Sequence, residues 1–189
     1  MKENDWTKEI AEEIEGKLKE QLGENICVST FVEVPYSYKF NGFDSSWSID
    51  KKNCDSSEFQ VDLIIYEKDN NKMIPRVIVE SKVESITTHD AITYSHKANL
   101  HKAVMPYIRY GIMCGNIKQL PIRAFKHGTA FDFLFSFSCF DPTTQEMNEF
   151  IDMLKKEIAY SQQIQEILNT SMNRNRKKYH MIQKGLVIK

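Results

Sequence analysis

The sequence has no long apolar run and few cysteines, and both shortages exclude classes of protein. No stretch approaches the roughly 20 apolar residues of a membrane-spanning helix, and the charged start MKENDWTKE does not resemble a secretory signal. The four cysteines are scattered without a C-x-x-C pair, which disfavours a zinc site or a disulfide framework. We therefore expect a soluble cytoplasmic protein with reduced thiols and no membrane partner.

Glycine and proline are scarce as well, with 7 and 5 residues, while 41% of the chain is hydrophobic. This composition allows a sizeable core. The length of 189 residues fits one compact domain. We place that domain at residues 1–170 and expect a basic tail or arm at residues 171–189.

Acidic residues are missing from two long segments, residues 91–131 and 167–189. Each segment contains six bases, so together they carry +12, and the remainder carries −13 within a net charge of −1. Such segregation permits a basic face for a polyanion despite the nearly neutral total. Lysines that merely solvate ordinary surfaces would give the same count.

The hydrophobic pattern predicts the element order α-β-β-β-α-β-β-α. Helices are predicted over residues 5–22, with Asp5 as N-cap and Gly23 as stop, and over residues 88–105 and 142–169. Strands are predicted over residues 26–38, 59–66, 76–83, 110–114 and 130–140, with a loop at residues 41–57. Pro35 indicates an edge strand or a break. This order predicts an α/β fold, a mixed central β-sheet flanked by helices.

Asp62, Glu80 and Lys82 lie on two strands that are expected to form a hairpin. Glu80 and Lys82 are two residues apart and project to the same side, and the pairing can bring Asp62 beside Glu80. Two carboxylates on an apolar hairpin are costly unless a cation compensates them. With the backbone carbonyl of Ser81 and waters, they form an oxygen ligand set suited to magnesium. A bound metal would activate a water, which Lys82 could orient or help to deprotonate.

The two segments VDLII and VIVESK resemble the motif of the PD-(D/E)XK nuclease superfamily, which includes type II restriction endonucleases, Holliday-junction resolvases and repair nucleases. The resemblance covers roughly residues 5–114 and departs from the pattern at Val61, where the motif name has proline. It implies a restriction-endonuclease-like αβββαβ core followed by a C-terminal helix. It also implies that Asp62 and Glu80 bind Mg²⁺, for which Mn²⁺ would substitute, and that Lys82 is the catalytic lysine.

Further site residues are suggested by the same resemblance. Glu13 is a candidate for the acid that the superfamily often adds from its first helix, although Glu9 and Glu12 compete and a solvated helix face is the commoner reason for such a residue. Lys97, on the helix after the motif, could reach the scissile phosphate or be a surface lysine.

Contacts to the DNA backbone are expected from bases beyond the motif, because phosphates are bound mainly by such side chains. The candidates are Arg123 and Lys126 and, in the tail, Arg174, Arg176, Lys177 and Lys178. The tail could instead be a solubilising end.

The expected function is a metal-dependent DNA endonuclease of restriction-enzyme character. Cutting two strands with one small catalytic domain requires a second site, so we expect a homodimer or a recognition partner subunit. A structure-specific nuclease, of the junction-resolvase or repair type, is an open alternative. A non-catalytic nucleic-acid-binding or assembly module on the same fold is another.

Overall fold

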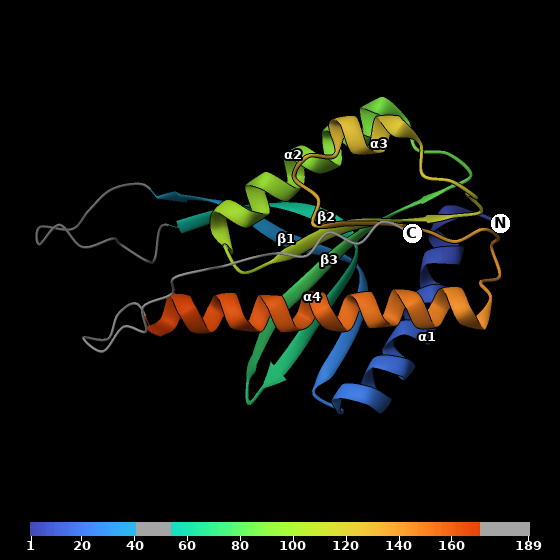
Figure 1. Cartoon of the computed structure of the whole chain (residues 1–189). Helices are drawn as coiled ribbons and strands as arrows, with labels where there is room; N and C mark the ends of the chain where they lie inside the picture. The colour runs from blue at the N-terminus through green and yellow to red at the C-terminus, as the bar shows by residue number, and fades with distance from the viewer. Residues whose placement is uncertain (41–53, 171–189) are drawn as a thin grey trace, which may run out of the picture.

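The chain folds into three layers, with a β-sheet between two layers of helices (Figure 1). The computed structural model describes residues 1–40 and 54–170. The elements are α1 (Glu3–Leu22), β1 (Ile26–Phe40), β2 (Cys54–Asp69), β3 (Lys72–Val83), α2 (Thr88–Val104), β4 (Arg109–Gly115), α3 (Ile122–His127), β5 (Phe133–Ser136) and α4 (Thr144–Thr170). Helices α1 and α4 cover one face of the sheet, and α2 and α3 cover the other.

The sheet is mixed, and its strands lie in the order β1-β2-β3-β4-β5. The first three strands are antiparallel neighbours, whereas β3, β4 and β5 run parallel. Parallel neighbours need a crossover connection. Helix α2 makes the crossover from β3 to β4, and α3 lies in the one from β4 to β5. The predicted α/β fold with a mixed sheet flanked by helices is therefore confirmed.

Each face of the sheet has its own apolar core, because side chains on successive strand positions point to opposite faces. Trp6 and Ile14 of α1 pack with Phe150 and Leu154 of α4 against one face. On the other face, Ala98 of α2 lies in a smaller core with apolar side chains of the strands. A third group joins the start of α2 to α3. Both helical layers are thus fixed to the sheet by burial.

Several element boundaries differ from the prediction. Helix α1 begins at Glu3, so Asp5 lies in its first turn and Lys2 is the N-cap. Helix α3 was not predicted, because six residues are too short to show a helical period. The last strand spans only Phe133–Ser136, and residues 54–57 of the predicted loop belong to β2. The remainder of that loop, residues 41–53, lies outside the described residues.

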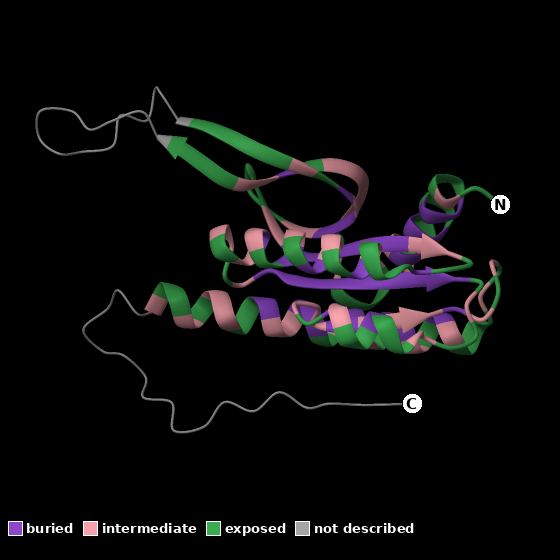
Figure 2. Ribbon diagram, turned by 90° about the horizontal axis from the view of Figure 1, so that it is seen from above, coloured by how far each residue is buried: buried purple, intermediate pink, exposed green. Residues whose placement is uncertain are grey.

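The outer parts of β1 and β2 form an exposed two-stranded ribbon that extends past the sheet (Figure 2). Strand β2 pairs with β3 only from Leu63 to Asp69, so its earlier residues pair with β1 alone. The register of the ribbon shifts between Pro35 and Ser37, as the proline predicted. Asp62 therefore lies at the junction between the ribbon and the sheet.

A search of residues 1–40 and 54–170 for a membrane-crossing helix finds none with the necessary length and apolar character.

Candidate active site

Strands β2 and β3 separate where Asp62 and Glu80 face each other. Their backbone pairing reaches Leu63 and Val79 and then ends. Beyond that point, hydrogen bonds to side chains replace the backbone pairing. The backbone N–H of Ser81 donates to Asp62 Oδ2 at 2.8 Å. In return, the Asp62 N–H points at Glu80 Oε2, at the longer distance of 3.4 Å. The two carboxylates thus fill the opening between the strands, as the hairpin pattern predicted.

The backbone is bent at this point. Phe31, opposite Asp62, has φ 55°, in the left-handed region that is unfavourable for a bulky residue. Val61 and Leu63 should share a face in a regular strand, yet Val61 packs on the α2 side and Leu63 on the α1 side. The ribbon therefore changes faces at Asp62. A left-handed residue of this kind costs of order 1–3 kcal/mol and is typical of functional sites.

Glu80 is completely buried, and its Oε1 is held by two donors. Tyr110 of β4 donates its hydroxyl to Glu80 Oε1 at 2.5 Å, and Lys97 Nζ lies 3.2 Å from the same oxygen. Burial and the nearby carboxylate of Asp62 raise the pKa of Glu80 to about 7, although Lys97 and Tyr110 act in the opposite direction. Burial beside this carboxylate also raises the pKa of Tyr110 well above its ordinary value.

Lys82 projects to the same side as Glu80 but has a different partner. Its ammonium lies 2.8 Å from a carboxylate oxygen of Glu3, in the first turn of α1, and 5.5 Å from the centre of the Tyr94 ring. Burial lowers the pKa of Lys82, but hydrogen bonds to Glu3 and Tyr94 more than offset it, so the pKa lies above its ordinary value. Lys82 is thus a fixed cation.

Helix α1 is anchored to this strand at a second point. Thr7 lies one turn after Glu3 and is hydrogen-bonded through its hydroxyl to the Ser81 hydroxyl, at 2.7 Å. Ser81 is buried, and its hydroxyl also lies 3.3 Å from Asp62 Oδ2. The start of α1 therefore closes one side of the site.

The donors present suit a hard divalent cation. Asp62 Oδ1 accepts no hydrogen bond from any described residue, and Glu80 Oε2 has only the long contact to the Asp62 N–H. Among the described residues, no other donor contacts these two carboxylate oxygens, and magnesium takes such ligands together with a carbonyl and waters. Within the described ranges, no three His, Cys, Asp or Glu side chains gather as a metal site. Of the described side chains, the site therefore offers two carboxylates, to be completed by backbone and solvent.

Glu13, the predicted helix acid, does not reach this cluster. Its side chain is exposed and pairs with Lys17 at 3.8 Å. The acid of α1 that lies at the cluster is Glu3, which pairs with Lys82 and is ten positions from Glu13, or about 15 Å along a helix. Lys97 lies beside Glu80, and its contact to the scissile phosphate stays a prediction.

The predicted basic face is smaller than the acid-free segment suggested. Three of the six bases in residues 91–131 are ion-paired with acids elsewhere: Lys97 with Glu80, Lys102 with Asp132, and Arg109 with Asp132 and Glu157. The other three, Lys118, Arg123 and Lys126, are exposed. The two on α3 lie close to the start of α2, because Ala124 packs there against Ala91. Arg174, Arg176, Lys177 and Lys178 lie outside the described residues.

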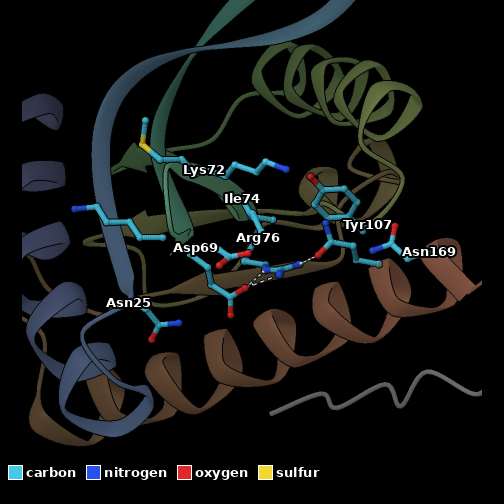
Figure 3. Close-up of a pocket in the computed structure, with 11 residues that line it drawn as sticks. Asn25, Asp69, Lys72, Ile74, Arg76, Tyr107 and Asn169 are labelled. Carbon is cyan, nitrogen blue, oxygen red and sulfur yellow. Dashed lines mark hydrogen bonds and ion pairs between the residues drawn. The ribbon is translucent and has the colours of Figure 1, made fainter.

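A pocket of about 800 Å³ lies at the turn between β2 and β3, several residues along both strands from Asp62 and Glu80 (Figure 3). At its base the Arg76 guanidinium is hydrogen-bonded to Glu67 and to Gln165, the latter at 2.8 Å. The cation is satisfied within the protein. This pocket therefore has no part in the site.

Sequence reasoning missed Glu3, Tyr94 and Tyr110. Tyr110 was identified only as part of a buried strand, although a buried tyrosine hydroxyl normally requires a partner. Tyr94 belongs to the helix predicted over residues 88–105, and its ring centre lies 5.5 Å from the Lys82 ammonium and 5.2 Å from that of Lys97. His101 is a buried histidine whose Nε2 contacts the Val34 carbonyl at 3.2 Å.

The sequence matches no protein-family model and no curated protein.

Proposed function

We propose that this protein is a metal-dependent DNA endonuclease of the PD-(D/E)XK type, with a restriction-endonuclease-like core. The observation that carries the proposal is the convergence of Asp62 and Glu80 at the point where β2 and β3 separate, with Lys82 two residues further along β3. The order of the first six elements, αβββαβ, is the one that the superfamily resemblance implies.

Asp62 and Glu80 would hold Mg²⁺ or Mn²⁺, together with the backbone carbonyl of Ser81. The cation would lower the pKa of a bound water and neutralise charge on the attacked phosphate. Lys82 is held as a cation by Glu3 and Tyr94, so its role is to orient the water or contact the phosphate rather than to act as a neutral base.

DNA would approach over the exposed bases Arg123 and Lys126 of α3, with the basic tail as a further contact. A homodimer, or a partner subunit that recognises the sequence, would supply the second cut. A structure-specific nuclease has the same catalytic requirements, so the choice of substrate separates the two functions.

The test is incubation of the protein with a plasmid, a four-way junction and single-stranded DNA, with and without Mg²⁺. Cleavage that requires Mg²⁺ and is lost in Asp62→Asn, but not in Glu13→Gln, supports the proposal. Absence of cleavage for all three substrates, together with intact DNA binding in Ca²⁺, would favour a non-catalytic nucleic-acid-binding module instead.

A further inference from the structure

Lys97 is the cation paired with Glu80. Its ammonium lies 3.2 Å from Glu80 Oε1, and only 17% of its side chain is exposed, while the Glu80 side chain is completely buried. A buried carboxylate is costly unless it is paired. Lys97 therefore occupies the electrostatic role that a divalent cation would fill.

Lys97 also has contacts that do not involve Glu80. Its ammonium lies 3.0 Å from the backbone carbonyl oxygen of Gln60. It lies 5.2 Å from the centre of the Tyr94 ring and 5.6 Å from that of Phe59. Carbonyl oxygens and aromatic faces attract cations without carrying a full charge. The ammonium would thus remain beside the site if it lost Glu80.

We propose that Lys97 and a divalent metal compete for Glu80, so that metal binding transfers Lys97 from this carboxylate to the Gln60 carbonyl and the aromatic rings. The inference rests on the proposed metal site. A dication bound to Glu80 would lie a few Å from the ammonium, and like charges at such separations repel each other. Lys97 and Tyr110 both contact Oε1, whereas the metal would bind at Oε2, so the competition is electrostatic rather than for one oxygen atom.

The competition also gives Lys97 a second role, contact with the substrate, once metal is bound. Released from Glu80, its ammonium is a positive charge without a carboxylate partner at the mouth of the site. A phosphate group of the substrate is the anion that would restore its pairing. Metal binding would thereby free Lys97 to contact a phosphate group, which its pairing with Glu80 otherwise prevents.

The experiment is calorimetric titration of the full chain with MnCl₂ alone, comparing wild type, Lys97→Met and Lys102→Met. Lys102 is the matched control, because it lies on the same helix and is ion-paired with Asp132 at 2.9 Å. Loss of one competing charge should tighten Mn²⁺ binding of Lys97→Met about tenfold, whereas Lys102→Met should bind as wild type does. Thermal unfolding supplies a second readout: Mn²⁺ should raise the Tm of Lys97→Met more than that of wild type.

Equal or weaker Mn²⁺ binding by Lys97→Met, at a site that Asp62→Asn abolishes, would overturn the competition and leave the proposed function standing. If wild type and Lys97→Met both bind no Mn²⁺, the metal site and the proposed function fail together. Should Lys97→Met not fold without metal, the polar Lys97→Gln variant removes the same charge and takes its place in both measurements.

Discussion

The buried Glu80 carboxyl makes a specific prediction about stability and pH. Its pKa is about 7 in the folded protein, against an ordinary value of 4.5, because burial and Asp62 both oppose its ionisation. Between these two pH values the folded state binds a proton that the unfolded state does not. The free energy of unfolding should therefore decrease as pH rises from 4.5 to 7, by about 3 kcal/mol for this group.

Glu80→Gln isolates that contribution, because the amide has the same shape and does not titrate. Urea unfolding of both proteins would be followed from pH 4.5 to pH 8 with EDTA present. The stability of wild type relative to Glu80→Gln should fall by about 3 kcal/mol across this range. The comparison is needed because burial lowers the pKa of His101. This shift makes the free energy of unfolding increase with pH below pH 6.5, which is opposite to the effect of Glu80. That trend is common to both proteins and cancels in the difference.

Two outcomes would refute the reasoning: a difference that does not change with pH, or one that grows as pH rises. Glu13→Gln, which removes an exposed carboxyl from α1, is the control and should show no comparable decline. Saturating Mn²⁺ should abolish the decline in wild type, because a metal ligated by Glu80 stabilises its ionised form.

Three further predictions concern the neighbours of this carboxyl and the DNA surface. Lys82→Ala should slow cleavage by roughly 100-fold while Mn²⁺ binding persists, and loss of activity only in Lys97→Ala would place the catalytic lysine on α2. Tyr110→Phe should lower the free energy of unfolding at pH 8 by about 2 kcal/mol, the usual scale for a hydrogen bond to a charged group, and a loss near zero would show that the hydroxyl contributes no such bond. Replacing Arg123 and Lys126 together with alanine should reduce the salt dependence of DNA binding by about 0.9 per lost phosphate contact, measured by anisotropy in Ca²⁺, and an unchanged slope would exclude α3 from the interface.

The central part of the site could be predicted because strand geometry is regular. Side chains two apart on a strand share a side, and Glu80 and Lys82 do contact the same helix, α2, through Lys97 and Tyr94. The hairpin brought Asp62 beside Glu80 although the strand is bent there, because the pairing of Leu63 with Val79 sets the register just before it. The apolar residues around each acid fixed both strands in the sheet, and with them the position of the carboxylates.

Groups supplied by other elements could not be predicted, because their placement depends on how each element packs. Helix α1 has many acids, and its apolar stripe does not tell which end of the helix lies at the open end of β3. That end is the first turn, so Glu3 rather than Glu13 reaches Lys82. The left-handed backbone conformation of Phe31 could not be predicted either, because nothing in the local sequence indicates that a bulky residue adopts it.

Charge balance within the site favours cation binding at Asp62 and Glu80 over a purely structural salt-bridge network. Lys82 is paired with Glu3, and Lys97 with Glu80. Among the described residues Asp62 has no ion-pair partner, so the cluster of three carboxylates and two ammoniums keeps one negative charge when Glu80 is ionised. A network that served only stability would gain nothing from this charge, since an unpaired charge beside a buried carboxylate opposes folding. Binding of a cation at Asp62 and Glu80 would offset the cost of this negative charge. That cation would come from outside the chain or from a part of the chain beyond the described residues.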